Sequence, residues 1–342
     1  MRRILICFVC LACLLTGCAS PAQTEGPTQY QATFLTLFDT VTTILGYAES
    51  EEAFQEKAQA IHDQLLEYHQ LFDIYNDYEG IANLKTINDQ AGVAPVAVDQ
   101  RIVDLLLECK EYYALTDGKV NVAMGSVLKL WHDARTAGID DPEHAALPDE
   151  AALEEASAHC NLDDVIVDEE AGTVFLADPD MQLDVGAVAK GWSAQQVCAQ
   201  IEEGMLVSIG GNVCATGPKA TGAQWVVGVQ SPEKGDAGYL HTLNISDGSV
   251  VTSGDYQRYY VVDGKSYHHI IDPETRMPAN YWRSVTILCP DSGLADCLST
   301  ALFLLDQEQG QALLDKTQAL AMWVAQDGTI TYSPGFEDYI RT

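Results

Sequence analysis

The sequence predicts a single α+β domain built on antiparallel strands, and three observations support this class. Helical and strand-like segments do not alternate regularly along the chain, as they would in a doubly wound parallel sheet. Short β-rich segments crowd into the C-terminal half. The chain has 342 residues, so that residues 33–342 alone are long enough to bury a large core.

The first 32 residues are expected to lie outside that domain. Two arginines, an apolar run over residues 4–15 and a Leu-Thr-Gly-Cys sequence make residues 1–17 resemble a secretory signal peptide. The run is shorter than the roughly 20 residues of a membrane-spanning helix. The sequence around Cys18 resembles a bacterial lipobox and predicts a lipidated N-terminus; an ordinary signal peptide with an incidental cysteine is the alternative. Residues 18–32, rich in Pro, Gly, Thr and Gln, are then a flexible tether.

Five segments have the composition or periodicity of helices. They are residues 53–72, 99–115, 142–158, 187–202 and 293–305. The first carries Phe54, Ala58 and Ile61 at helical spacing, and Asp99 is a suitable N-cap for the second. These segments predict helices that bury one apolar face each.

Strands are predicted where β-branched and aromatic residues cluster between turn signals. The segments are residues 38–47, 165–167, 173–176, 182–185, 205–209, 225–230, 242–245, 249–253, 256–262 and 284–288, with a closing hairpin of 319–324 and 329–332. Most of them follow the third predicted helix, which places the β-rich half of the domain at its C-terminal end.

Charge and cysteine content limit the possible partners. With 18 Lys and Arg against 50 Asp and Glu, the net charge is −32, which argues against nucleic acid as a partner because that needs a basic surface. Such a chain suits a divalent cation where carboxylates converge. No Cys-x-x-Cys pair is present, so a structural zinc site is not expected. Six cysteines follow Cys18; we expect buried free thiols, with disulfides as the alternative.

The chemistry-bearing segment that stands out is residues 268–273, His-His-Ile-Ile-Asp-Pro. Histidine changes charge near neutral pH, and a neighbouring carboxylate can orient it as a base. A surface loop with a chance histidine pair is the alternative. The segment predicts a strand end that carries a reactive imidazole to the rim of a pocket.

Two further segments combine charge with a turn or a helix. Residues 183–192 read as a strand that turns at Gly186 into a helix, which places Asp184 and Lys190 near a helix N-terminus suited to phosphate; glycines that serve only packing are the alternative. Asp296 and Thr300 lie one helical turn apart and offer oxygen ligands for Mg²⁺, although a first-turn acid can also be purely structural.

Two weaker segments complete the set. Residues 208–212, Ser-Ile-Gly-Gly-Asn, form a glycine turn at which a ligand could approach the backbone, or a plain turn. Residues 251–260 form a polar turn in which Ser253 and Arg258 could bind substrate, or an ordinary hairpin turn.

Taken in order, these motifs resemble the ApbE family of FAD:protein FMN transferases over residues 38–332, nearly the whole mature chain. Several spaced motifs in the right order are more specific than any one of them. The matching runs are Phe38-Asp39-Thr40, residues 184–192, 210–212, 252–254, 269–273 with Thr275 and Pro278, and 295–296 with 299–301.

The resemblance implies the ApbE-like, T-fold-related α+β fold and an exported, membrane-attached, Mg²⁺-dependent enzyme. Such an enzyme splits FAD, releases AMP and attaches FMN through a phosphoester to a Ser or Thr of a redox protein. The implied FAD contacts are Phe38, Tyr75, Asn121, Asp184, Lys190 and Ile270. The implied Mg²⁺ ligands are the Ala187 carbonyl and the side chains of Asp296 and Thr300, and His269 is the implied base toward the incoming hydroxyl. Pyrophosphate cleavage needs this kind of charge neutralisation and in-line placement.

The chain departs from the family pattern at two positions. Arg276 stands where the family usually has glycine, so residues 273–278 are not expected to form the same turn with φ above zero without strain. Phe38 stands where many members have Met, which conserves an apolar contact. Neither change removes a catalytic group.

Two other function classes remain open. An FAD pyrophosphatase would use the same metal site with water as the acceptor, and the sequence does not separate it from a transferase. A lipoprotein that only carries FAD would not need both the Asp296 and Thr300 pair and His269, so these groups favour catalysis. The lipid anchor predicts the extracytoplasmic face of a bacterial membrane; the acceptor and the oligomeric state are not defined.

Overall fold

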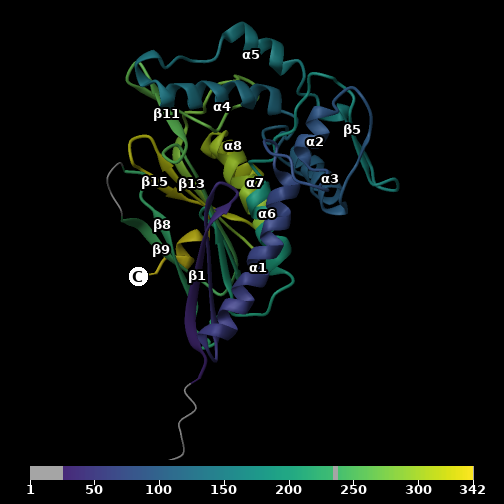
Figure 1. Ribbon diagram of the computed structural model, residues 1–342. Helices are drawn as coiled ribbons and strands as arrows, with labels where there is room; N and C mark the ends of the chain where they lie inside the picture. The colour runs from purple at the N-terminus through teal and green to yellow at the C-terminus, as the bar shows by residue number, and fades with distance from the viewer. Residues whose placement is uncertain (1–25, 234–237, 342) are drawn as a thin grey trace, which may run out of the picture.

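The central sheet of the protein is antiparallel throughout and has eight strands in the order β1-β2-β6-β7-β10-β13-β14-β15 (Figure 1). The structure is a computed structural model that describes residues 26–233 and 238–341. The strands are β1 (Thr28–Leu37), β2 (Thr40–Ala48), β6 (Leu206–Ile209), β7 (Asn212–Thr216), β10 (Asp247–Gly254), β13 (Trp282–Cys289), β14 (Leu320–Ala325) and β15 (Ile330–Tyr332). In β2 every second side chain from Thr42 onward is buried, so one face is committed to a core.

Helices cover one face of this sheet (Figure 1). They are α1 (Glu51–Phe72), α6 (Ala189–Cys198), α7 (Ser292–Phe303) and the following α8 (Gln307–Leu314). Ser50 caps α1 by accepting from the Ala53 N–H, and the apolar face of α1 packs into the largest core cluster. Helix α7 is buried on nearly all sides because it lies between α6 and the sheet. The crossing of α6 and α7 is therefore one of the most constrained parts of the molecule.

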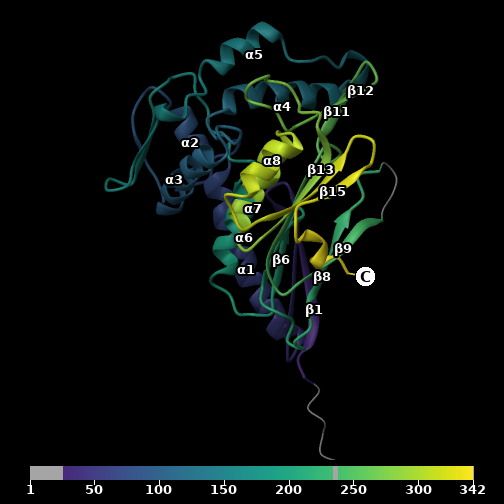
Figure 2. The same ribbon diagram turned by 180° about the vertical axis from the view of Figure 1, so that it is seen from behind.

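The opposite face of the sheet is covered by a two-stranded hairpin and a short helical turn, which are seen from behind in Figure 2. The hairpin consists of β8 (Trp225–Gln230) and β9 (Tyr239–Ile245), and the turn is η3 (Phe336–Tyr339). Strand β8 alternates strictly between buried and exposed side chains. Trp225 and Phe336 fill a second core cluster there. The sheet thus has a core on each face.

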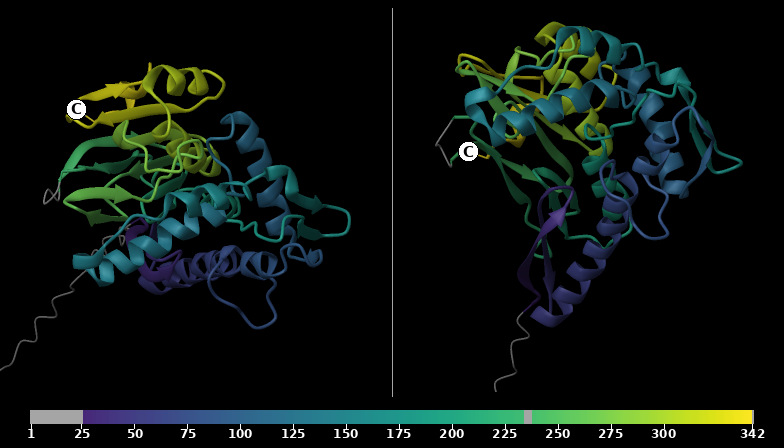
Figure 3. Two further views of the ribbon diagram at one scale, coloured as in Figure 1. Left: turned by 90° about the horizontal axis from the view of Figure 1, so that it is seen from above. Right: turned by 45° about the horizontal axis from the view of Figure 1, so that its top comes forward.

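Two smaller groups of elements extend from one end of the sheet (Figure 3). The first contains α2 (Leu84–Asp89), α3 (Gln100–Leu115), η2 (Leu162–Asp164) and the small sheet β3 (Val96–Ala97), β5 (Thr173–Leu176) and β4 (Val165–Asp168). The second contains α4 (Gly125–Asp140), η1 (Pro142–His144), α5 (Glu150–Ser157), β11 (Tyr259–Val262) and β12 (Lys265–His268). A third core cluster, which includes Trp131 and Tyr260, joins α4 to β11.

The α+β class predicted from sequence is confirmed, as are the Asp99 cap and the free cysteines. Part of the predicted tether is wrong, because residues 28–32 pair with β2 as the first half of β1. Residues 38–39 form the turn before β2, so that strand begins at Thr40 rather than at residue 38. Residues 1–25, which include Cys18 and the predicted signal peptide, lie outside the described residues. Within residues 26–233 and 238–341, no helix is long and apolar enough to cross a bilayer.

Other predicted boundaries are wrong for local reasons. The helix expected over residues 142–158 is interrupted, because Pro142 starts a short 3₁₀ turn and α5 begins only after the Asp149 cap. Residues 182–185 form no strand and keep a single bridge, from Gln182 to Met124. The predicted strand 256–262 begins at Tyr259, and the predicted helix 187–202 is shorter at both ends.

The sequence prediction missed seven helices and strands, namely α2, α4, α8, β1, β3, β7 and β12. Helix α4 gives no strong start signal because no side chain caps it and a glycine begins it. Gly125 is required there for close packing: a Cβ at this position would lie 2.4 Å from the Gln182 carbonyl oxygen. The start of α4 thus depends on a contact with Gln182, which is far from it in the sequence.

Candidate functional site

A cleft opens between the C-terminal end of α1, the turn that joins β1 to β2, and the loop that leads into α6. Four of the predicted site residues line this cleft: Phe38, Tyr75, Asp184 and Lys190. Arg258, in the turn just before β11, lines it as well. Segments far apart in the sequence therefore meet at one surface.

The turn beneath Phe38 holds the ring at the cleft. Phe38 and Asp39 both have φ of 52°, a left-handed conformation that costs a non-glycine residue about 1–2 kcal/mol. The Phe38 N–H donates to His69 Nδ1 at 3.2 Å, and the two rings meet edge to face with centroids 5.5 Å apart. The contact with α1 fixes the turn and explains why residue 38 is not part of the strand.

Tyr75 presents an aromatic ring to the cleft because Asp73 fixes the chain just after α1. The Asp73 carboxylate accepts from the backbone N–H of Tyr75 at 2.6 Å and from the hydroxyl of Tyr78 at 2.7 Å. Burial alone would raise the pKa of Asp73, but hydrogen bonds from Asn76, Tyr75 and Tyr78 outweigh it and lower that pKa. The Tyr75 side chain is 53% exposed and lies against the His132 ring at 5.2 Å. This surface suits stacking on a planar ring.

Asp184 is held by a backbone network at the base of the cleft. Its N–H donates to the Val122 carbonyl at 2.8 Å, and its Oδ1 accepts from the Gly186 N–H at 2.8 Å. The side-chain amide of Asn88 makes two hydrogen bonds with the backbone of Leu183, 95 residues away. Burial raises the pKa of Asp184 above its ordinary value.

Asn121 and Ile270 are placed differently from the other predicted FAD contacts. Asn121 lies next to the strand-like segment that carries Asp184, but its amide bonds to the Cys160 carbonyl and the Ala123 N–H. The Ile270 side chain is 5% exposed and belongs to the main core. Neither side chain lines the cleft, so a contact from either with FAD remains a prediction.

The crossing of α6 and α7 brings together the predicted metal ligands. Gly191 lies in the first turn of α6, where a backbone N–H has no partner within the helix, and it donates to Asp296 Oδ2 at 2.8 Å. Ala187 precedes α6, and its carbonyl accepts no backbone hydrogen bond among the described residues. Lys190 Nζ lies 3.6 Å from the same Asp296 oxygen, and Asp296 is buried at 3% exposure.

The approach of the two helices is possible only because residue 191 is glycine. A Cβ there would lie 2.2 Å from the Ser292 carbonyl oxygen and 2.4 Å from Asp296 Cβ, well inside contact distance. Thr300 follows Asp296 by one turn on α7. A backbone carbonyl, a carboxylate and a hydroxyl are oxygen donors that Mg²⁺ accepts, so the donor set fits a hard divalent cation. Ser253 Oγ lies 2.8 Å from Ser299 Oγ, and a contact of Ser253 with substrate stays a prediction.

The two adjacent histidines have different environments. His268 uses both ring nitrogens internally: one lies 2.6 Å from the Ala279 carbonyl oxygen, and the other accepts from the Ile270 N–H at 3.2 Å. His269 Nδ1 is buried and has no hydrogen-bond partner among the described residues. Burial, and then the charge of Arg258, lower the pKa of His269 to about 3, so its imidazole is neutral. His268 therefore has a structural role, and His269 is the histidine available for chemistry.

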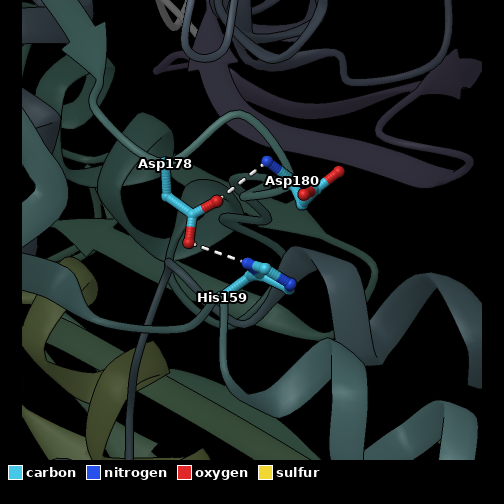
Figure 4. Close-up of side chains that lie close together, drawn as sticks. All are labelled: His159, Asp178 and Asp180. Carbon is cyan, nitrogen blue, oxygen red and sulfur yellow. Dashed lines mark hydrogen bonds and ion pairs between the residues drawn. The ribbon is translucent and has the colours of Figure 1, made fainter.

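Another set of possible metal ligands consists of His159, Asp178 and Asp180 (Figure 4). His159 Nδ1 lies 2.7 Å from Asp178 Oδ2, and this hydrogen bond raises the pKa of His159. The Asp180 N–H donates to the other Asp178 oxygen at 2.9 Å. His159 and Asp178 form an ion pair, and the Asp180 N–H closes a turn onto the Asp178 carboxylate. None of the three residues is a predicted Mg²⁺ ligand.

Comparison with known proteins places the chain in a family. The model described as "ApbE family" matches residues 33–324. The chain belongs to the ApbE family. A relative from Treponema pallidum named FAD:protein FMN transferase is 37% identical, and the match covers 75% of this chain and 75% of the relative. A Klebsiella pneumoniae protein of the same name is 33% identical over 80% of this chain and 86% of the relative.

Solved structures of ApbE proteins have the same fold. The ApbE protein from Thermotoga maritima superimposes with a TM-score of 0.81 at 29% identity, covering 92% of this chain and 100% of that chain. The flavin transferase ApbE from Vibrio cholerae gives 0.75 at 24% identity, over 92% and 99% of the two chains. The ApbE-like fold expected from the motifs is confirmed.

The structure adds residues to the site that sequence reasoning did not select. Arg135 and His132 from α4 lie beside Tyr75, whose hydroxyl is 3.4 Å from His132 Nδ1. No signal in the sequence pointed to them, because α4 itself was not predicted. The turn at residue 276 keeps its left-handed conformation without glycine: Arg276 adopts φ of 59°, so the expected strain is present. Its carbonyl accepts from the Trp131 indole at 2.9 Å, which helps to hold the left-handed turn.

Proposed function

We propose that this protein transfers FMN from FAD to a Ser or Thr hydroxyl of an acceptor redox protein. The pyrophosphate P–O–P bond of FAD breaks, a phosphoester forms between FMN and the hydroxyl oxygen, AMP leaves, and the hydroxyl proton goes to a base. The observation that carries this proposal is the α6–α7 crossing, where the buried Asp296 carboxylate accepts from the Gly191 N–H and lies 3.6 Å from Lys190 Nζ. The family membership and the names of the relatives point to the same reaction.

Mg²⁺ would be held by the Ala187 carbonyl, Asp296 and Thr300. When bound, it would neutralise charge on the pyrophosphate oxygens. Lys190, which already lies near Asp296, would add a cation that contacts a phosphate oxygen. Asp296 is then shared between the backbone of α6 and the metal, so its position is set before the metal arrives.

His269 would accept the proton of the incoming hydroxyl. A base with a pKa of about 3 is weak, but part of that shift comes from the charges of Arg258, Arg135 and Lys190. Phosphate groups of bound FAD would offset these positive charges and move the pKa of His269 upward, toward the range in which a general base is effective. Bound FAD would thus make His269 a stronger base toward the acceptor hydroxyl, while Tyr75 would stack on one of the rings of FAD.

The test is intact-protein mass spectrometry of an acceptor domain incubated with the full chain in detergent, FAD and Mg²⁺. The expected result is a mass gain of FMN minus water that disappears when Mg²⁺ is chelated. Release of AMP without a mass gain would favour an FAD pyrophosphatase, and FAD that stays bound and intact would favour a carrier. An acceptor with its Ser or Thr replaced by Ala is the matched control.

We also propose that the protein works from the outer face of a bacterial membrane, held by a lipid on Cys18. This rests on residues 1–18 of the sequence alone. Cys18→Ala in the full-length protein should move it from the membrane fraction to the soluble fraction while a soluble assay of transfer is unchanged. Retention of the variant in membranes would contradict the anchor.

A further inference from the structure

Two arginines next to the cleft, Arg258 before β11 and Arg135 on α4, form no ion pair with a carboxylate among the described residues. Arg276 and Arg341 form none either, whereas Arg101 and Arg283 do. Arg101 binds both Asp99 and Glu67, and Arg283 binds Glu233. Arg258 makes no hydrogen bond or ion pair within residues 26–233 and 238–341, although it lines the cleft. Acidic residues outnumber basic ones 50 to 18, so an unpaired arginine at a functional surface calls for an explanation.

Arg135 strengthens the observation because it is partly buried. Its guanidinium lies 3.2 Å from His132 Nδ1, and no carboxylate pairs with it in the described part of the chain. Burial, and then the positive charge of Arg258, lower the pKa of Arg135, so the two side chains act on each other through space. Removing a cation from water beside another cation is unfavourable unless an anion offsets both.

The packing of α4 against β11 fixes this arrangement. Tyr260 of β11 lies in the same core cluster as Trp131 of α4, and its hydroxyl donates to the Ala146 carbonyl at 3.2 Å. Arg258 and Arg135 each lie close to these packed residues in sequence. Asp184 interacts electrostatically with both arginines, but it forms no ion pair with either one.

We propose that Arg258 and Arg135 bind a phosphate group of the FAD substrate, at a position separate from Lys190 and the metal ligands. The inference rests on the proposed function and adds two residues to it. A guanidinium recognises a phosphate through two parallel N–H···O bonds, and two of them can hold one phosphate in a fixed orientation. The cleft would then have cations on both sides of the pyrophosphate, so that the P–O–P bond is positioned between them.

Equilibrium binding tests this assignment without requiring turnover. The full chain in detergent is titrated with FAD or with riboflavin, with Mg²⁺ chelated, and flavin fluorescence is recorded. Riboflavin has the flavin ring and the ribityl chain but no phosphate. We expect R258Q to weaken FAD binding by about 10- to 100-fold and to leave riboflavin binding within about 2-fold, as for lost hydrogen bonds to a charged group. R135Q should act in the same direction.

Matched variants keep the result interpretable. R101Q removes an arginine that is already paired and should leave the affinity for FAD unchanged. R258K keeps the positive charge but lacks the paired N–H donors of the guanidinium, so it should retain part of the affinity for FAD. If R258Q fails to fold, R258K still tests the assignment. The wild-type affinity for FAD should also fall with added salt more steeply than that of R258Q.

Two results would overturn the inference. An equal loss of riboflavin and FAD binding would mean that the arginines only maintain the shape of the cleft. Unchanged FAD binding with slower transfer would mean that they contact the acceptor protein instead. A wild-type protein that binds FAD but transfers no FMN would contradict the proposed function and leave the binding comparison valid.

Discussion

The two sides of the cleft are built in different ways. On one side, which we call the buried wall, Lys190 lines the cleft, and behind it Gly191 of α6 meets Asp296 of α7, with Ala187 just before α6 and Thr300 on α7. On the other side, the exposed wall, Tyr75 and Arg258 line the cleft, and His132 and Arg135 of α4 lie beside Tyr75. The buried wall is held by contacts between helices, whereas the exposed wall is held by loop hydrogen bonds and by ring contacts.

This difference separates stability from binding. A group such as the Asp296 carboxylate satisfies a buried backbone N–H, so its removal affects both the fold and the chemistry. A group such as the Tyr75 ring is half exposed, so its removal should affect ligand binding with little loss of stability. Substitutions on the two walls are therefore expected to give different combinations of activity, affinity and melting temperature.

His269 should give the largest effect on rate. His269→Ala is expected to lower FMN transfer by about 10²- to 10⁴-fold, the usual contribution of a general base, while FAD binding changes by less than about 2-fold. The measurement is the initial rate of acceptor labelling together with an FAD titration. His144→Ala, at an exposed histidine, is the control. Unchanged transfer in His269→Ala would remove the base assignment.

Asp296→Ala, in the buried wall, should lower both the activity and the stability of the protein. Turnover is expected to fall by about 10²- to 10³-fold and to lose its response to added Mg²⁺, because a metal typically supplies several kcal/mol of charge stabilisation. The melting temperature should also fall, since an unpaired buried N–H at Gly191 costs about 1–3 kcal/mol. Asp180→Ala is the control at the other acidic group. A normal Mg²⁺ response in Asp296→Ala would contradict the ligand role.

Gly191→Ala tests the packing of the buried wall directly. The added methyl group would meet the Ser292 carbonyl oxygen and Asp296 Cβ, so α6 and α7 must move apart. We expect a loss of about 1–3 kcal/mol in the free energy of unfolding, as for other overpacked cores, with a loss of Mg²⁺-dependent turnover. Urea unfolding gives the first quantity. Gln196→Ala in the same helix should change neither, and wild-type stability in Gly191→Ala would show that the crossing is loose.

Tyr75→Ala tests the exposed wall. Loss of a stacking ring should weaken FAD binding by about 10-fold, because stacking of an aromatic side chain on a base contributes about 1–3 kcal/mol. The melting temperature should stay within about 2 °C of the wild type, since half of the side chain is exposed. Tyr75→Phe keeps the ring and should bind FAD normally. A large drop in the melting temperature would place Tyr75 among the structural residues.

Arg276→Gly should give the smallest effect. Glycine removes the left-handed strain of about 1–2 kcal/mol but increases the entropy of the unfolded chain by roughly 0.4–1 kcal/mol. The net change should be stabilising and below about 1 kcal/mol, with transfer unaffected, because the backbone bonds of the turn remain. A destabilised variant would mean that the Arg276 side chain itself supports the turn.

Sequence alone was sufficient for the class of fold, and it supplied the candidate groups of the site. The spacing of Asp296 and Thr300 on one helix, and the adjacent histidines, are local features that a linear chain displays directly. The same is true of the Asp99 cap and of α1, whose periodic apolar face was recognised. Such signals depend only on neighbours within one or two turns.

Tertiary structure decided which of these groups act together. Only the fold separates His268, whose two ring nitrogens are both engaged, from His269, whose Nδ1 has no partner among the described residues. Only the crossing of α6 and α7 joins Gly191 to Asp296, 105 residues apart, and only the packing of α4 brings Arg135 toward Arg258. The physical reason is that a buried hydrogen bond or a converging charge depends on distances through space, which spacing along the chain does not determine.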